Sequence, residues 1–180
     1  MRKRSTRGRR TVAFTLIEMM VVMAIIALLA GLALPSFRHA MMRAQSLKCA
    51  QNLRGIGIAA SLAATDNNNR YPEIDQAAAP VYTPQGPNLI TVLGTYGITT
   101  NVLQCPVDIS VSPSNFSTYG SSYEWDPVFD NEPVNATYAY VTPTRVVPVN
   151  SGRVVLALDF SGVHNGRPNV LFGDGHVLTH

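Results

Sequence analysis

One acidic residue, Glu18, lies near the start of an otherwise apolar run, and its type and position suit it to forming a charged contact. The first 13 residues hold six arginine or lysine side chains and no acid, and Met19 to Leu34 contains no charged or strongly polar side chain. An ionised carboxylate in hydrocarbon costs roughly 2.5–3.5 kcal/mol even on lenient scales. We therefore expect Glu18 to have a cationic partner, which a simple membrane anchor would not need.

The segment AFTLIEMMVVMAIIALLAGLALP, residues 13–35, resembles the N-terminus of type IV prepilins, a family shared by type IV pilins and the pseudopilins of type II secretion. The resemblance implies that a prepilin peptidase cuts between Ala13 and Phe14 and that the new N-terminus is methylated at Phe14. Glu18 and Pro35 then match the acidic and proline positions of the family, counted from Phe14. The family usually has glycine before the cut, where this chain has Ala13.

Cleavage would leave the α-ammonium of Phe14 as a second charge in an apolar setting. In a bundle of staggered helices, this ammonium on one subunit can meet the Glu18 carboxylate of its neighbour. Buried ion pairs are better supported as devices of specificity than of stability. We therefore expect the pair to fix the axial register of assembly with other pilin-like subunits, in a homopolymer or a heteropolymer.

The charge pattern also predicts a topology and a division into segments. Basic residues before an apolar span hold it with its N-terminus in the cytoplasm, and 21 helical residues from Phe14 to Leu34 span about 30 Å, enough for a bilayer core. We predict a single-pass protein of the inner (cytoplasmic) membrane with an extracytoplasmic C-terminal domain. Its expected segments are a leader at 1–13, an apolar helix at 14–35, an amphipathic continuation at 36–65 and a globular domain at 66–180.

The basic composition of the chain comes from its leader. The formal net charge is +3, and it becomes −3 once the six basic side chains of residues 1–13 are removed. No later stretch clusters lysine and arginine as phosphate binding requires, so nucleic acid is not an expected partner. No nucleophile elbow, phosphate loop or metal-hydrolase spacing occurs, so we do not expect an enzyme or a cofactor.

Hydrophobic spacing predicts an α+β, pilin-like fold. Apolar residues recur every three or four positions after Pro35, which predicts one helix from about Phe14 to Ala64, bent or loosened near Gly31 and Pro35. The expected apolar face of its second half contains Met41, Met42, Ala44, Leu47, Ala50, Leu53, Ile56, Ala59, Ala60 and Leu62.

The remainder of the chain has the composition of loops and short strands. We predict a short helix at Leu89–Gly94 and a strand at 103–107. Residues rich in β-formers predict further strands at Thr137–Val141, Val154–Asp159, Asn169–Phe172 and His176–Thr179. Asp174-Gly175 lies between the last two, and an Asp-Gly pair between apolar segments is a strong hairpin signal.

A second motif lies near the C-terminus, where His164 is followed by nine residues and then Asp174-Gly175. This H-x9-DG segment resembles one found in a subgroup of prepilin-like bacterial proteins, which the chain also resembles at residues 48–60, 66–72 and 103–108. One hypothesis is a cation or ligand site made by His164 and Asp174, to which Asp159 or His176 could be added. The alternative is structural: Asp174 serves the turn and His164 bonds the adjacent hairpin, since one histidine with scattered carboxylates is not a metal-ligand spacing.

Two cysteines, Cys49 and Cys105, are the only ones in the chain. An even count outside the cytoplasm is compatible with one disulfide, although two unpaired buried thiols remain an alternative. Within the resemblance to the H-x9-DG subgroup, both cysteines fall in recurrent places, which favours pairing.

Two further groups of residues are candidates for binding. Carboxylates in the loops are candidates for a structural calcium site, although they match no recognised calcium loop: Asp66, Asp108, Asp126, Asp130 and Glu132. Trp125 with Tyr119, Tyr123 and Phe129 forms an aromatic recognition surface or, alternatively, part of the core or of a stacked surface loop. The expected function is a structural subunit of a type II secretion pseudopilus or type IV pilus-like filament. The alternative is a membrane-anchored extracytoplasmic protein that binds a ligand or substrate.

Overall fold

The computed structural model describes residues 14–75, 86–142, 145–160, 164 and 166–179. The chain divides into two compact units, residues 1–41 and 42–180. A single helix, α1 (Leu16–Asp66), contributes residues to both units and is continuous through Gly31 and Pro35. The expected loosening at these two residues therefore does not interrupt the helix.

The described part of the first unit is apolar helix. Every side chain described from residue 14 to residue 34 is exposed, including Phe14 at 72%. The helix α1 is the one element described in this unit. No other described helix or strand of the unit therefore covers these side chains. A helix that is apolar nearly all round needs an apolar environment to cover it.

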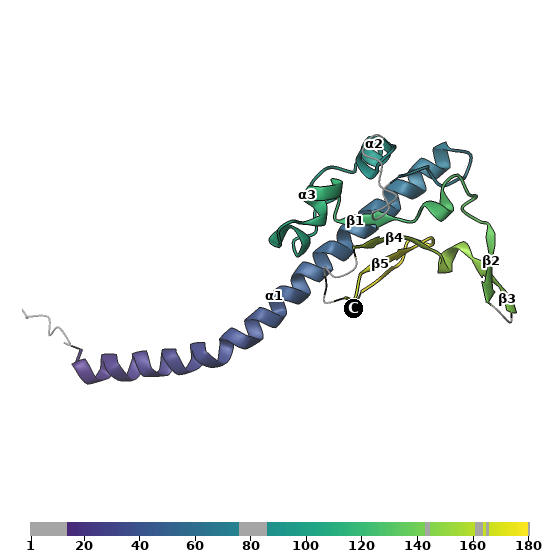
Figure 1. Ribbon diagram of the computed structural model, residues 1–180. Coiled ribbons are helices and arrows are strands. Elements are labelled where there is room, and N and C mark those ends of the chain that lie inside the picture. Colours follow the sequence, from purple (N-terminus) through teal and green to yellow (C-terminus); the bar gives the residue numbers. More distant parts are fainter. Residues whose placement is uncertain (1–13, 76–85, 143–144, 161–163, 165, 180) are drawn as a thin grey trace, which may run out of the picture. The chain divides into compact units, whose positions relative to one another are not determined.

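In the second unit, an antiparallel four-stranded sheet has the order β1-β4-β5-β6 (Figure 1). Its strands are β1 (Tyr123–Trp125), β4 (Val155–Asp159), β5 (Val170–Phe172) and β6 (Val177–Leu178). A separate hairpin pairs β2 (Thr137–Thr142) with β3 (Arg145–Asn150). The molecule thus has the predicted α+β, pilin-like layout of one long helix and a small antiparallel sheet.

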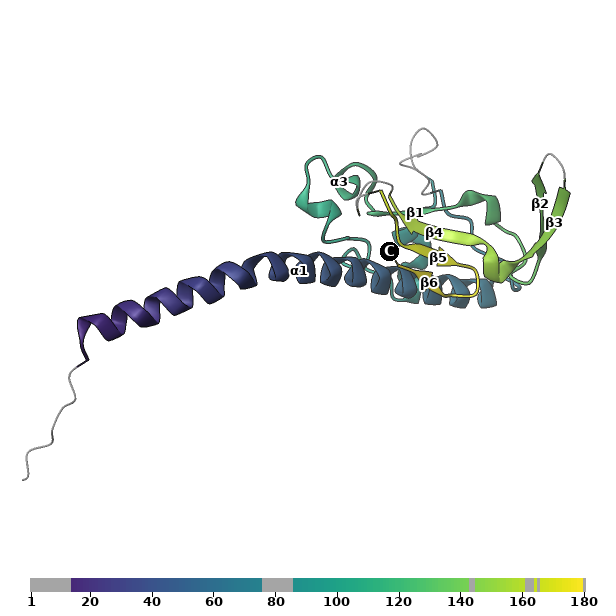
Figure 2. The ribbon, with the colours of Figure 1, turned by 90° about the horizontal axis from the view of Figure 1, so that it is seen from below.

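The C-terminal half of α1 packs along one face of this sheet (Figure 2). Leu53, Ile56 and Ala60 are wholly buried, and their spacing of three and four places them on one side of the helix. The core continues through Leu171 on β5. Gly57 permits the close approach, because a Cβ atom there would lie 2.8 Å from Leu171 Cδ1.

Short elements complete the second unit around α1. The helix α2 (Leu89–Leu93) is capped by Asn88 and continues into a 3₁₀ turn at Gly94–Tyr96, so the short helix predicted at Leu89–Gly94 is present. The helix α3 (Asn115–Tyr119) follows a 3₁₀ turn at Asp108–Ser110. Two more 3₁₀ turns lie at Pro127–Phe129 and Ser151–Arg153.

Several details of the fold differ from those predicted from the sequence. Residues 103–107 are not a strand: the carbonyl of Leu103 accepts the amide of Ser122, but Pro106 has no amide to donate and the segment continues in turns. The strands β1 and β3 were not predicted. The apolar face assigned to α1 was too wide, because Met41, Met42, Leu47 and Leu62 are 48–56% exposed.

Candidate functional site

The start of α1 is organised by Thr15 and Glu18. The Glu18 carboxylate oxygen Oε2 accepts hydrogen bonds from the backbone N–H and the hydroxyl of Thr15, at 2.8 and 2.7 Å. The Thr15 hydroxyl oxygen in turn accepts the backbone N–H of Glu18 at 3.3 Å. This is a reciprocal capping box, and the Thr-x-x-Glu spacing that signals it was present in the sequence but was not used in the prediction.

The capping box occupies one oxygen of Glu18. Both hydrogen bonds to the carboxylate end on Oε2, and the described part of the chain offers none to Oε1. A carboxylate has acceptor capacity on both oxygens. Glu18 can therefore cap its own helix and still accept a donor from another molecule.

The other residues predicted to take part in processing and assembly are placed only in part. Ala13 lies outside the described residues, so cleavage between Ala13 and Phe14 stays a prediction. Phe14 immediately precedes the capped first turn, and Pro35 lies within α1. By length and composition, α1 is the one described helix that is apolar enough to cross a membrane.

A disulfide lies inside the second unit. Cys49 on α1 is bonded to Cys105, their Cα atoms are 5.2 Å apart, and both residues are wholly buried. The bridge joins α1 to the 103–107 segment across a sequence separation of 56 residues. It thus fixes the helix to the loop-rich part of the unit.

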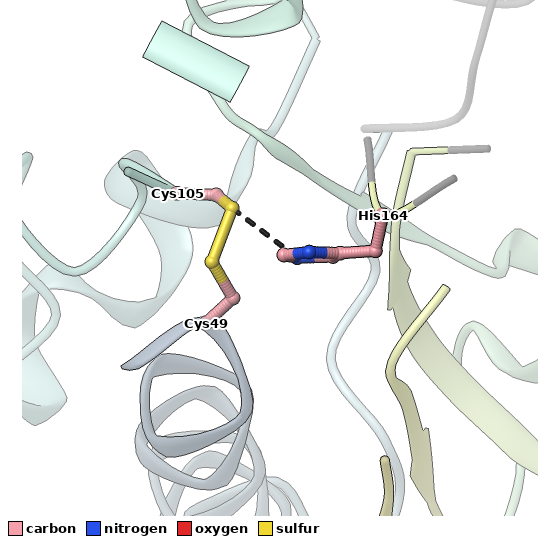
Figure 3. A group of neighbouring side chains, drawn as sticks. All are labelled: Cys49, Cys105 and His164. Carbon is pink, nitrogen blue, oxygen red and sulfur yellow. Dashed lines mark hydrogen bonds between the residues drawn. A yellow bond between two sulfur atoms is a disulfide. The ribbon is translucent and has the colours of Figure 1, made fainter. Parts of the chain in front are cut away.

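His164 points its ring at this disulfide (Figure 3). Its Nε2 atom lies 3.5 Å from Cys105 Sγ and 3.1 Å from Oδ2 of Asp159, which is fully buried at the end of β4. The two oxygens of Asp159 also accept the backbone N–H and the side-chain amide of Asn169, each at 2.7 Å. A buried carboxylate is thereby supplied with three donors.

His164 and Asp174, at the two ends of the H-x9-DG segment, make separate contacts. Asp174 Oδ1 accepts the backbone N–H of His176 at 3.0 Å and also contacts the His176 ring. The backbone hydrogen bond from His176 is the main reason why the pKa of Asp174 is lowered. Gly175 adopts a φ of 84°, which suits glycine, and completes the turn between β5 and β6.

The predicted cation site that joins His164 to Asp174 is therefore not formed. His164 pairs with Asp159 beside the disulfide, whereas Asp174 pairs with His176 at the hairpin. The structural role proposed for Asp174 agrees with the geometry. His164, however, bonds the end of β4 and faces a sulfur atom, which the sequence did not predict.

The loop carboxylates proposed for calcium act as local acceptors. Asp108 is buried and accepts the backbone N–H groups of Asn115 and Phe116 at 2.9 Å, and the Ser122 hydroxyl at 2.7 Å. Asp126 caps the turn at 127–129.

The remaining candidates are spread over other elements. Asp66 accepts the Tyr96 hydroxyl, Asp130 accepts the Trp125 indole N–H, and the carbonyl of Glu132 accepts the amide of Tyr71. In the described ranges, the three-residue group that could hold a metal ion is instead Cys49, Cys105 and His164. The carboxylates named for calcium do not form such a group there.

Of the aromatic residues named with Trp125, Tyr123 and Phe129 belong with it to the buried core, whereas Tyr119 is partly exposed. Trp125 and Tyr123 on β1 have no exposed surface, and Phe129 is 8% exposed. Tyr119 stacks on Phe160 with ring centres 5.2 Å apart. Burial of Trp125 removes one of the two features that supported the ligand-binding alternative, the other being the loop-rich middle of the chain.

Comparison with known proteins identifies the N-terminal segment. Residues 13–34 match the family model described as the prokaryotic N-terminal methylation motif. This motif is the hallmark of type IV prepilin-like proteins, so the chain carries a prepilin-like N-terminus on a pilin-like α+β layout. No curated protein and no solved structure matches the chain. The assignment to the H-x9-DG subgroup stays a prediction.

Proposed function

We propose that this protein is a structural subunit of a type II secretion pseudopilus or type IV pilus-like filament. A prepilin peptidase removes residues 1–13, Phe14 is N-methylated, and the mature chain assembles with other pilin-like subunits through α1. The observation that carries the proposal is a methylation motif at residues 13–34, where α1 is exposed and apolar and its one carboxylate is Glu18.

The subunit is held in the inner membrane before assembly, with its N-terminus in the cytoplasm and its C-terminal domain outside. The basic leader supports this orientation. The same apolar side chains then serve two environments, first lipid and afterwards the packed helices of a filament. Helices in such settings associate by close packing and by polar contacts between them.

Glu18 sets the stagger between subunits in this proposal. Its Oε2 atom is engaged by Thr15, whereas Oε1 is available to the α-ammonium of Phe14 on a neighbouring subunit. One axial offset brings the two charges together, because each helix carries one ammonium and one carboxylate in its apolar part. A subunit at another offset would leave both charges without a partner, at a cost of several kcal/mol.

The capping role and the pairing role of Glu18 are separated by a pair of variants. Glu18→Gln keeps an amide oxygen that can accept the Thr15 N–H but removes the charge. Thr15→Val keeps the charge and removes the capping hydroxyl, at a cost of about 1 kcal/mol to the helix start. Both variants are expressed in the native host and followed in membranes and in sheared filaments.

If charge pairing directs assembly, Glu18→Gln remains inserted and processed but loses filaments, whereas Thr15→Val still assembles. The reverse result, with assembly kept in Glu18→Gln and lost in Thr15→Val, would show that Glu18 acts only as a cap. Whether secretion of a substrate or surface pili fails in Glu18→Gln cells distinguishes the pseudopilus from the pilus.

A further inference from the structure

Side chains with metal-ligating atoms lie next to the Cys49–Cys105 disulfide. Cys49, Cys105 and His164 bring one ligand atom each within 4.8 Å of one another (Figure 3). The Asp159 carboxylate reaches the same nitrogen of His164 at 3.1 Å. Thiolate, imidazole and carboxylate are together the ligand set of zinc sites. We propose that the reduced form of this chain holds a zinc-like divalent cation through these four side chains.

The distances in the structure support a tetrahedral site. Bonds of about 2.0 Å to nitrogen and oxygen and 2.3 Å to sulfur place tetrahedral donors about 3.3 Å apart for N and O, and about 3.6 Å apart for N and S. The corresponding separations are 3.1 Å from His164 Nε2 to Asp159 Oδ2 and 3.5 Å from Nε2 to Cys105 Sγ. The two separations that start from His164 Nε2 are therefore close to those that one ion requires.

The two sulfur atoms must move apart and also approach the Asp159 carboxylate, which is not among the ligand atoms that lie within 4.8 Å of one another. The sulfur atoms are bonded in the oxidised chain and would lie about 3.8 Å apart on a tetrahedral ion. Rotation about the Cα–Cβ bonds separates them while the Cα atoms stay 5.2 Å apart. The newly made chain begins with two thiols, and each thiol gives up one proton on binding the ion. Thiol–disulfide exchange with an oxidised partner passes two electrons from the sulfurs to that partner's disulfide, forms the Cys49–Cys105 bond, releases the ion and abolishes the site.

The surroundings already orient the ligands. Asp159 is held by two hydrogen bonds from Asn169, which are the outer contacts that fix a ligating carboxylate. Both cysteines and Asp159 are fully buried, while the His164 side chain is 9% exposed and marks the route of entry. In the oxidised chain, the same arrangement lets His164 Nε2 donate a hydrogen bond to Asp159.

The test is a cobalt titration of the full-length chain in detergent micelles. A phosphine reduces the disulfide, taking its oxygen from water, and is then removed without air. We expect the reduced parent to bind one Co²⁺ per chain, with sulfur-to-metal charge transfer and the intense visible bands of tetrahedral coordination. Zn²⁺ should displace the Co²⁺, and the oxidised parent should show neither band.

Variants assign the ligands. His164→Ala and Asp159→Asn should each weaken binding by at least about tenfold, the loss that even an outer-shell partner causes. His176→Ala is the matched control, because it removes a histidine with its own aspartate at the hairpin, and it should bind as the parent does. A reduced parent without tetrahedral bands, or His164→Ala with parental affinity, overturns the proposal.

A second measurement does not depend on the folding of a variant. In the reduced parent, Zn²⁺ should slow alkylation of both thiols at least about tenfold, and a chelator should restore the rate. An alkylation rate unaffected by Zn²⁺ also overturns the site. Neither outcome bears on filament assembly, so this inference and the proposed function fail or hold separately.

Discussion

Two glycines on α1 give a matched test of how closely the helix approaches the sheet. A Cβ atom at Gly57 would lie 2.8 Å from Cδ1 and 3.3 Å from Cδ2 of Leu171, whereas at Gly55 the nearest atom, Val102 Cγ1, is 3.8 Å away. Alanine in a helix interior is favoured over glycine by up to about 1 kcal/mol. That gain applies equally to Gly55→Ala and Gly57→Ala.

The two sites differ in what the new methyl group meets. Leu171 is wholly buried on β5, so it can yield only by displacing its core neighbours, and overpacking of this kind costs typically about 1–3 kcal/mol. We expect Gly55→Ala to stabilise the protein by about 0.5–1 kcal/mol and Gly57→Ala to destabilise it by up to about 2 kcal/mol. The predicted difference between the variants is about 1–3 kcal/mol.

Urea unfolding in detergent measures this difference. Trp125 is the single tryptophan and is fully buried on β1, so its fluorescence reports loss of the second unit. The slopes of the two unfolding curves must agree for their midpoints to be compared. Equal stability of the two variants, or a more stable Gly57→Ala, would refute the close packing of α1 on β5.

The remaining predictions concern the disulfide and a half-buried acid. Replacing Cys49 and Cys105 together by alanine should cost at most about 4 kcal/mol, since the bridge closes a loop of 56 residues, and a midpoint equal to that of the parent in the same urea assay would contradict this role. Burial raises the pKa of Asp130, which accepts the Trp125 indole N–H. The folded state disfavours the charged form of Asp130, so the protonated side chain is the form that favours folding. Its contribution to stability is fully present below the ordinary pKa of 3.8 and is lost as pH rises through the raised pKa. The stability of the parent relative to Asp130→Asn should therefore fall with rising pH over the acidic range, and a difference independent of pH would contradict the assignment.

Sequence patterns within a few residues of one another predicted the helices and the turn whose formation depends on neighbouring residues. The long helix, the hairpin at Asp174-Gly175 and the short helix after Asn88 follow from apolar spacing, turn residues and capping. The strand β1 was missed because it is three residues long and its pairing with β4 joins residues far apart in the chain. The exposure of Leu47 and Leu62 was missed for a similar reason, since the width of the buried face depends on what packs against it.

The site was predictable only where its chemistry is local. Glu18 was identifiable because a lone acid in an apolar run is costly, and its capping partner lies three residues away. The meeting of His164 with Asp159 and the disulfide could not be read from spacing, because it depends on tertiary packing of α1, the 103–107 segment and β4. The H-x9-DG spacing suggested one site, whereas the fold divides it into two.

The central claim is that the chain is a processed, assembling pilin-like subunit, and mass spectrometry of the N-terminus from native membranes and sheared filaments tests it most directly. We predict a mature chain that begins at N-methylated Phe14 and retains the apolar part of α1 in both fractions. A chain that still begins at Met1, or one cleaved after Leu34, would contradict the account.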